Sequence, residues 1–207
     1  NGIVLPERWP PRTINPTDLN PMPVPYLDHP PAIIPIDVGR QLFVDNFLIE
    51  ETTLSRSYHK PRKYSGNPVL KPESALELNG EFNDAAVPKS GGLWWDPKEK
   101  IFKLWYEAGW INTICYATSK DGFYWERPAL DVVPGTNQVL PTDLKPDSWT
   151  VIPDWDATDP QQRYKMYMHP PGSGGAICMT SPDGTHWINR VKTAPSGDRS
   201  TAFYNPF

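Results

Sequence analysis

Three aspartates in this sequence head similar stretches of chain. Asp147 follows Asp84 by 63 residues, and Asp198 follows Asp147 by 51. Carboxylates held close together raise the pKa of at least one of them, which suits general acid–base chemistry. Hydrolysis of a glycosidic bond uses such a pair, with one group protonating the leaving oxygen and another acting as base or nucleophile. The alternative is that each aspartate caps a turn or binds a structural cation.

The elements that would position Asp84 lie between Phe82 and Tyr106. This stretch predicts three short strands joined by two turns, with no room for a helix. The strands are expected at 84–87, 93–95 and 101–106, and the turns at 90–92 and 96–100. Thr113 to Thr118 predicts one more strand. We therefore expect four short strands in this part of the chain.

The same order of features returns about sixty residues later. Residues 147–152 match 84–87, Trp155-Asp156 matches Trp95-Asp96, 164–167 match 102–105, and 177–180 match 115–118. A third copy begins at Gly197. About four short strands repeated at such a period are typical of β-propeller blades. The sequence therefore predicts an all-β fold with no helical segment between Phe82 and Trp187. The expected blades cover about 82–125 and 146–187, and a third begins at about 197.

The propeller geometry explains why the aspartates matter. The first strand of each blade lines a central channel, so Asp84, Asp147 and Asp198 would face one cavity. Propellers typically close with about four to eight blades, because an open ring leaves wet, unpaired faces. Two blades and the beginning of a third do not close a ring. We expect this chain to be part of a longer polypeptide, or its remaining blades to come from another one.

The string Ser-x-Asp-Gly-x-x-Trp occurs at 119–125 and again at 181–187. Asp and Gly suit a tight turn between antiparallel strands, because the carboxylate caps local amides and Gly takes a positive φ. The Trp would return to cover the hairpin. We interpret both copies as structural and assign them no chemistry.

Three strings resemble a known group of enzymes. Gly66–Leu70 (GNPVL), Asn83-Asp84 before a strand and Gly197-Asp198-Arg199 are similar to motifs of the five-bladed propeller glycosidases. These include the invertase/fructanase, arabinanase/xylosidase and mannoside-phosphorylase families. The resemblance implies a five-bladed propeller that acts on carbohydrate, with Asp84 as nucleophile or base and Asp198 as a carboxylate that stabilises the transition state.

The sequence departs from that pattern in two places. Ala85-Ala86 follows Asp84 where invertase-like enzymes have Pro-Asn, and Arg199 follows Asp198 where those families place an Arg before the Asp. The resemblance also implies a general acid, a Glu on the fourth blade, that lies outside this chain. We expect this chain by itself to be inactive.

Further residues are candidates for contacting a sugar near the channel. They are Asp147, Trp110, Trp149, Arg199 and Tyr204. The aromatic members could stack on sugar faces, although most Trp residues in propeller blades belong to the core. The prediction is therefore a glycoside hydrolase whose partner is an oligo- or polysaccharide. The alternative is a glycan-binding or scaffold propeller in which the aspartates are structural.

The bulk composition limits other functions. A formal net charge of −4 without a basic run argues against nucleic acid as the partner, and no apolar run reaches the length of a membrane span. The four His and two Cys match no metal-ligand pattern, so we predict no metal site and no cofactor other than a structural cation in the channel. Cys115 and Cys178 are expected to be separate thiols.

The N-terminal part differs in composition. Residues 1–39 carry many of the 26 prolines and predict an extended arm packed on the domain of residues 40–207, with a flexible leader as the alternative. Arg40 to Glu50 predicts the first ordinary strand, with Asp45-Asn46 as a bulge or turn inside it. The chain begins at Asn1 without Met. Together with the resemblance, this favours a secreted or periplasmic location.

Overall fold

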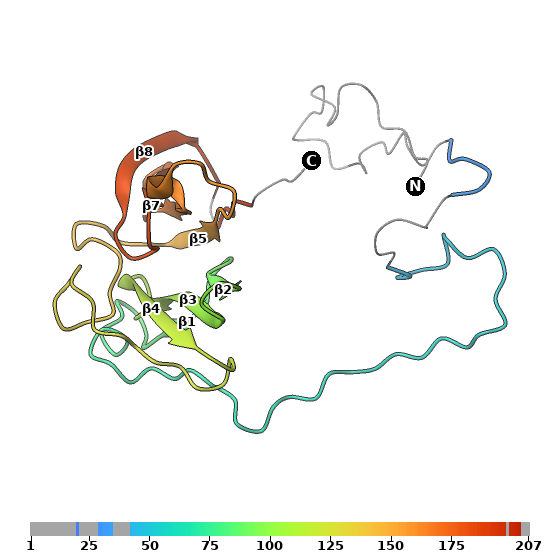
Figure 1. Cartoon of the computed structure of the whole chain (residues 1–207), viewed down its shortest axis with the longest axis horizontal. Coiled ribbons are helices and arrows are strands. Elements are labelled where there is room, and N and C mark those ends of the chain that lie inside the picture. Colours follow the sequence, from blue (N-terminus) through green and yellow to red (C-terminus); the bar gives the residue numbers. More distant parts are fainter. Residues whose placement is uncertain (1–19, 21–28, 35–41, 198, 204–207) are drawn as a thin grey trace. The chain divides into compact units, whose positions relative to one another are not determined.

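The computed structural model describes residues 20, 29–34, 42–197 and 199–203. Contacts divide the chain into two compact units, Asn1–Pro61 and Arg62–Phe207. The described residues of the first unit contain no helix or strand, and the second unit contains every strand described here (Figure 1). Most of the arm predicted over residues 1–39 lies outside the described residues.

The strand predicted from Arg40 to Glu50 is wrong for its described part, residues 42–50. A turn replaces it, in which the backbone N–H of Ile49 donates to the Asn46 carbonyl at 3.0 Å. The Asp45 carboxylate accepts the N–H of Phe47 at 2.9 Å. Asp and Asn compete for backbone donors in this way, which bends the chain before a ladder can form.

The first sheet contains four strands: β1 (Ala86–Val87), β2 (Leu93–Asp96), β3 (Ile101–Ala108) and β4 (Thr113–Ser119). All pairs are antiparallel. β4 lies along one side of β3, and β1 and β2 both pair with β3 on its other side. The strands and turns predicted between Phe82 and Thr118 are therefore confirmed.

The second sheet is an antiparallel meander in chain order: β5 (Ser148–Pro153), β6 (Tyr164–His169), β7 (Gly175–Ser181) and β8 (Ile188–Pro195). The described residues thus form an all-β structure of two antiparallel sheets (Figure 1). The expectation of no helical segment before Trp187 needs one correction. A 3₁₀ helix, η1 (Pro160–Gln162), lies between β5 and β6, because the Asp159 carboxylate caps it by accepting the N–H of Gln161.

The two sheets share a pairing register. Phe102 faces Ser119 and Trp105 faces Tyr116 in the first sheet, and Tyr164 faces Ser181 in the second, all with the spacing expected from the sequence. The register places Cys115 opposite Tyr106, whereas Cys178 lies opposite Tyr167, one position away from the match of Cys115. Both cysteines are free thiols, as expected.

One sequence match is wrong in detail. Asp154, and not Asp156, occupies the position of Asp96. Asp96 faces Ile101, and the N–H of Asp154 donates to the carbonyl of Arg163, the residue that matches Ile101. Each of the two aspartates also forms an ion pair with a lysine, Lys103 or Lys165, that lies two residues after the residue facing it. The sequence match of the two Trp-Asp dipeptides selected the wrong aspartate, because the second loop carries an extra Asp before its Trp.

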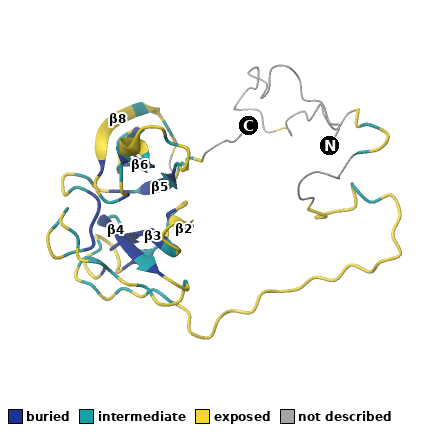
Figure 2. Cartoon of the chain, in the orientation of Figure 1, coloured by how far each residue is buried: buried dark blue, intermediate teal, exposed yellow. Residues whose placement is uncertain are grey.

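The main hydrophobic core lies between the sheets. Trp105, Trp149, Val151 and Met166 are buried in it. The N–H of Val151 donates to the carbonyl of Gly91 at 3.1 Å, so β5 directly contacts the turn between β1 and β2. A smaller cluster fills the far side of the first sheet, and Figure 2 shows both as dark blue segments of β3, β4 and β5. By contrast, β8 is largely exposed.

The two Ser-x-Asp-Gly hairpins have the structural role expected of them. The Asp121 carboxylate accepts the N–H groups of residues 123 and 124 at 2.8 and 3.0 Å, and that of Asp183 accepts those of 185 and 186 at 2.8 and 2.9 Å. Gly122 and Gly184 have positive φ values of 78° and 82°. The two glycines differ in their surroundings. A Cβ on Gly184 would lie 2.5 Å from the Trp105 ring, whereas a Cβ on Gly122 would meet nothing closer than 3.9 Å.

This difference yields a matched pair of variants. Gly122→Ala should cost about 1 kcal/mol of unfolding free energy, because it adds the left-handed strain alone. Gly184→Ala should cost about 3 kcal/mol or more, because Trp105 is buried and has no room to move. Urea unfolding of both variants measures the difference. Equal losses would show that the hairpin does not pack against Trp105 as described.

A buried carboxylate ties the segment before β1 to the first sheet. Glu77 accepts hydrogen bonds from the Tyr106 hydroxyl at 2.6 Å and the Arg127 Nε at 2.7 Å, and from the N–H groups of Glu73 and Ser74. Burial by itself would raise the pKa of Glu77, but the Arg127 guanidinium and the other donors outweigh it and lower the pKa to about 2.

Glu77→Gln should therefore lower stability by about 3 kcal/mol at pH 7, since it removes the buried carboxylate that partly buried Arg127 pairs with. The folded pKa is below the unfolded one, so this stabilisation is present above about pH 4.5 and is lost as the pH falls toward 2. Unfolding curves of wild type and variant should converge over that window. Glu73→Gln, which changes an exposed carboxylate 3.7 Å from Arg127, serves as control and should have little effect.

Candidate functional site

Asp84 stands directly before β1, where hydrogen bonds hold the backbone on both sides. The Asn83 carbonyl accepts the N–H of Trp110 at 3.0 Å, and the Ala85 carbonyl accepts that of Gly109 at 2.9 Å. The Asp84 side chain is exposed and has no hydrogen bond or ion pair with the described residues. A fixed backbone with an uncommitted carboxylate leaves this group available to a ligand.

Asp147 stands before β5, half-buried, with its N–H donating to the His169 carbonyl at 2.9 Å. The strand register shows that it is not the exact counterpart of Asp84. Val87 faces Glu107 and Ser148 faces His169, which occupy matching positions in β3 and β6. Asp84 therefore lies two positions further from its sheet than Asp147 does.

The leading segments of the three sequence copies meet at hydroxyl and carbonyl groups. The Thr150 hydroxyl donates to the Ser90 carbonyl at 2.7 Å. Thr201 lies beside both, with its Oγ1 2.7 Å from that of Thr150 and 3.0 Å from the Ser90 carbonyl. Residues that are about fifty to sixty positions apart in sequence thus converge on one line of contact.

Next to this line lies a charged cluster that the sequence analysis missed. The Lys89 ammonium is 3.3 Å from Glu107 Oε2, donates to the Asp147 carbonyl at 3.1 Å and lies 4.2 Å from the centre of the Trp110 ring. The Lys89 and Glu107 side chains are 8% and 0% exposed. Lys89 therefore links the residues around Asp84 to those around Asp147.

Glu107 also holds the turn that carries Trp110. Its Oε1 accepts the N–H of Ile111 at 3.1 Å. Ile111 has a φ of 56°, which is strained for a β-branched residue and persists where the surroundings enforce it. Burial raises the pKa of Glu107, and the nearby Asp147 raises it further, against the opposing effects of the Ile111 N–H and Lys89. A charged residue in the middle of an apolar strand was the sequence signal for this group.

The other predicted site residues divide into three kinds. The Arg199 guanidinium lies 5.9 Å from the centre of the Trp110 ring, which brings the third leading segment near the first. Trp149 is fully buried in the core between the sheets and does not offer a face to a sugar. Asp198 and Tyr204 lie outside the described residues. The geometry of the site is therefore described without a distance between the Asp84 and Asp198 carboxylates.

Two polar side chains at one end of the β5–β6 pair are buried without hydrogen-bond partners among the described residues. Neither ring nitrogen of His169 nor the hydroxyl of Ser148 has a hydrogen-bond partner among the described residues. The two residues face one another across β5 and β6, so their side chains share one face of the sheet. Buried polar groups normally find a partner, so this face is one that a further element or a ligand would complete.

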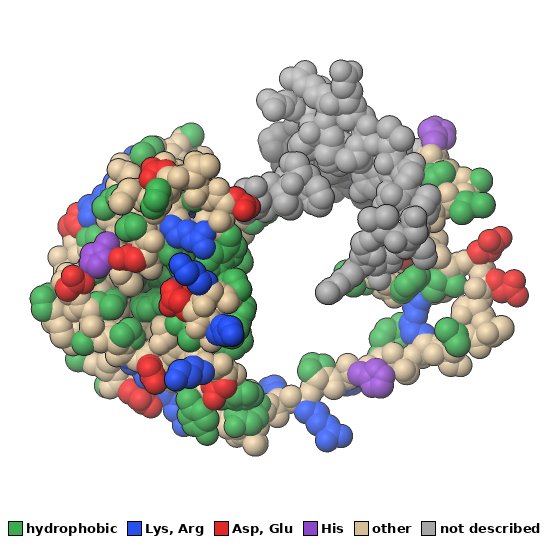
Figure 3. Space-filling view, in the orientation of Figure 1, with side chains coloured by type: hydrophobic (Ala, Val, Ile, Leu, Met, Phe, Trp, Pro, Cys, Tyr) green, Lys and Arg blue, Asp and Glu red, His purple; other side chains and the backbone are tan. Residues whose placement is uncertain are grey.

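The surroundings of the three leading segments limit which ligands this region could bind. A cavity of about 920 Å³ opens beside Ser90, Thr150 and Thr201, but neither Asp84 nor Asp147 lines it. Within the described part of the chain, no three His, Cys, Asp or Glu residues are placed to hold a metal ion. Acidic and basic side chains are interspersed over the face of the second unit seen in Figure 3.

No family model, no curated protein and no solved structure matches this chain. The resemblance to five-bladed propeller glycosidases therefore remains a prediction from the sequence.

The raised pKa of Glu107 leads to a pH-dependent prediction. Its folded pKa lies above the unfolded one, so ionising it costs stability as the pH rises from about 4.5 through the folded pKa. Glu107→Gln, which stays neutral, should gain stability relative to wild type across that rise. Urea unfolding at pH 4 to 8 measures the trend, with Glu81→Gln, at a half-exposed carboxylate, as control. A constant difference at every pH would contradict the prediction.

Proposed function

We propose that the two sheets are neighbouring blades of a β-propeller. Both consist of four antiparallel strands, and their central strands pair in the same register. In the first sheet, Cys115 and Thr118 of β4 also bridge to Gln138 and Glu126, which supplies a fourth line of chain beyond β4. This line corresponds to β8 of the second sheet. Two sheets of one design, built from successive segments, are what a blade repeat predicts.

The way the sheets stack supports a ring. In β3, Trp105 faces the second sheet, whereas Leu104 and Tyr106 face the opposite cluster. In β6, Met166 and Met168 match Leu104 and Tyr106, yet they face the first sheet. The front of one sheet therefore packs on the back of the next. Head-to-tail contacts of this kind close into rings when further copies are added.

The face of the second sheet that points away from the first sheet fits the same front-to-back stacking. Side chains alternate along a strand, so Lys165, Tyr167 and His169 of β6 turn away from the first sheet. Thr201 of the third leading segment already contacts this side at Thr150. A third blade would cover this face and bring partners to His169 and Ser148. On this proposal further blades bring the total to five and complete the channel.

We infer that the propeller acts on carbohydrate as a glycoside hydrolase. The observation that carries this proposal is the convergence of the three leading segments at Ser90, Thr150 and Thr201. The predicted aspartates Asp84, Asp147 and Asp198 precede these three residues in sequence by six, three and three positions. Lys89 and Trp110 connect the surroundings of Asp84 to Asp147, with Arg199 above the same ring.

Each residue has a stated role in this proposal. Asp84, exposed and uncommitted, acts as base or nucleophile, and Asp198 orients the sugar and stabilises the transition state. Asp147 and Arg199 bind substrate hydroxyls. Glu107 is buried and does not reach the substrate, so it positions Lys89 and the Trp110 turn. Protonation of the leaving group requires a further carboxyl group.

The proposal extends to partner and location. An oligo- or polysaccharide is the partner, and a secreted or periplasmic location follows from the same family resemblance. No helix in the described ranges is long and apolar enough to cross a membrane.

A non-catalytic glycan-binding or scaffold propeller is the alternative. The distance of 3.3 Å between Lys89 Nζ and Glu107 Oε2 favours this alternative, because an ion pair with a purely structural role has the same geometry. Substitution of Asp84 distinguishes the two functions, since only the hydrolase requires its carboxylate for turnover.

In the full-length protein, Asp84→Asn should lower the release of reducing sugar from its glycan at least about a hundredfold. The melting temperature should stay nearly unchanged, because the carboxylate is exposed and makes no hydrogen bond or ion pair with the described residues. Asp156→Asn, at another exposed carboxylate, is the matched control and should retain activity. If Asp84→Asn unfolds the protein, or leaves hydrolysis intact, the assigned role is wrong.

A further inference from the structure

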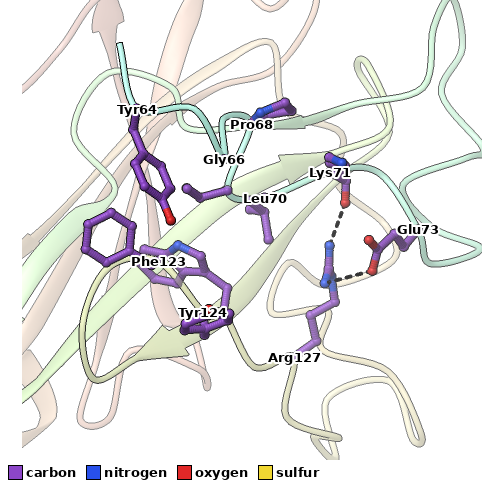
Figure 4. A pocket seen from close by; sticks show the side chains of 11 residues that line it. Tyr64, Gly66, Pro68, Leu70, Lys71, Glu73, Phe123, Tyr124 and Arg127 are labelled. Atoms are coloured by element: carbon purple, nitrogen blue, oxygen red, sulfur yellow. Dashed lines mark hydrogen bonds and ion pairs between the residues drawn. The ribbon is translucent and has the colours of Figure 1, made fainter. Parts of the chain in front are cut away.

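A second candidate site lies on the far side of the first sheet, away from the leading segments. It is a cavity of about 440 Å³ between the segment from Tyr64 to Glu73 and the hairpin after β4. Figure 4 shows aromatic rings of Tyr64, Phe123 and Tyr124 along one side and the charged groups of Arg127 and Glu73 along the other. Its volume falls within the range of small-ligand sites.

The aromatic rings are unusually exposed for their size. Tyr64 is 49% exposed, Phe123 48% and Tyr124 80%. Tyr64 and Phe123 meet edge to face, with ring centres 4.9 Å apart, so the two rings support one another. Large apolar side chains gathered in a hollow mark a binding surface more often than an accident of folding.

The second hairpin shows that the fold does not require these rings. The hydrogen bonds from the backbone amides of the turn to its Ser and Asp recur in it, with Asp183 capping the same two amides as Asp121. At the positions of Phe123 and Tyr124 it carries Thr185 and His186. The same capped turn therefore forms without aromatic side chains at these two positions, and the two rings of the first copy serve another purpose.

The opposite wall of the cavity is rigid. The Arg127 guanidinium donates to Glu77 Oε1 at 2.7 Å. It also donates to the Lys71 carbonyl at 2.7 Å and lies 3.7 Å from Glu73 Oε2 (Figure 4). Glu77 is itself fixed by four donors. A wall held in place by such a network is organised before any ligand arrives, which lowers the entropic cost of binding.

The charges and hydrogen-bonding groups of the cavity indicate the class of ligand. The two carboxylates of Glu77 and Glu73 are matched by the two cations Arg127 and Lys71, so no excess charge selects an ionic ligand. The exposed Glu73 carboxylate accepts hydrogen bonds, and the Tyr64 and Tyr124 hydroxyls both donate and accept them. A neutral saccharide combines apolar C–H faces, which stack on rings, with hydroxyl groups that donate to a carboxylate. We propose that this cavity is a saccharide-binding site separate from the aspartates before β1 and β5.

A proline-rich peptide is the competing ligand for an aromatic groove, and the geometry disfavours it. Such grooves bind extended proline segments and donate ring N–H groups to peptide carbonyls. The Trp125 indole N–H is already committed to the Gly122 carbonyl at 3.2 Å. Prolines also lack the N–H donors that Glu73 would accept.

The test titrates the chain with neutral hexasaccharides of the gluco, xylo, manno, arabino and fructo series, and separately with decaproline. Binding is followed by amide and indole shifts in ¹H–¹⁵N spectra. At least one hexasaccharide should shift resonances of Tyr64, Phe123 and Tyr124. The double variant Phe123→Thr/Tyr124→His should weaken that binding about tenfold or more. It inserts the residues of the second hairpin and should therefore keep its melting temperature.

Two controls separate this site from the proposed catalytic one. Phe82→Thr removes an exposed ring that does not line the cavity, and Asp84→Asn alters the proposed catalytic group; both should leave the affinity unchanged. Absence of any hexasaccharide binding, equal binding by the double variant, or shifts with decaproline alone would overturn the proposal. Saccharide binding here together with intact hydrolysis in Asp84→Asn would refute the catalytic proposal and leave this one standing.

Discussion

The second unit depends on how closely the two sheets approach one another at Trp105. This side chain is fully buried between the sheets, and its indole N–H donates to the Gly184 carbonyl at 2.6 Å. The rings of Tyr116 and Tyr164 lie against it, with centres 5.1 and 5.6 Å away. A central strand of one sheet is thereby fixed to the hairpin of the next. The direction of that contact, front to back, is what brings the leading segments of successive copies together.

Two buried carboxylates, Glu77 in the segment before β1 and Glu107 on β3, show how surroundings decide the properties of one chemical group. Glu77 receives four hydrogen bonds, including one from a guanidinium, and its pKa is lowered to about 2. Glu107 has one backbone donor and the Lys89 ammonium, so burial prevails and its pKa is raised. The first carboxylate therefore anchors a segment to the sheet as a permanent anion. The second is easily neutralised and stands beside the proposed site, where such groups are often found.

The two proposed sites lie on different parts of the first sheet and rest on different physics. The site before β1 and β5 depends on backbone segments that converge from distant parts of the sequence. The cavity behind the hairpin depends on the side chains of Phe123 and Tyr124, which the matching hairpin replaces with small or polar residues. The first site depends on the proposed blade repeat, and the second depends on residues that only the first hairpin carries. A substrate held at the second would raise its concentration near the first.

The sequence by itself determined the strands from β1 to β7 and both hairpins, because alternation, turn residues and the Ser-x-Asp-Gly string act over a few neighbouring positions. It also placed Asp84 and Asp147 just before leading strands. Tertiary structure decided which of the candidate side chains are accessible. Trp149 entered the core and Lys89 met Glu107 because burial depends on a partner sheet about sixty residues away, which no local pattern encodes.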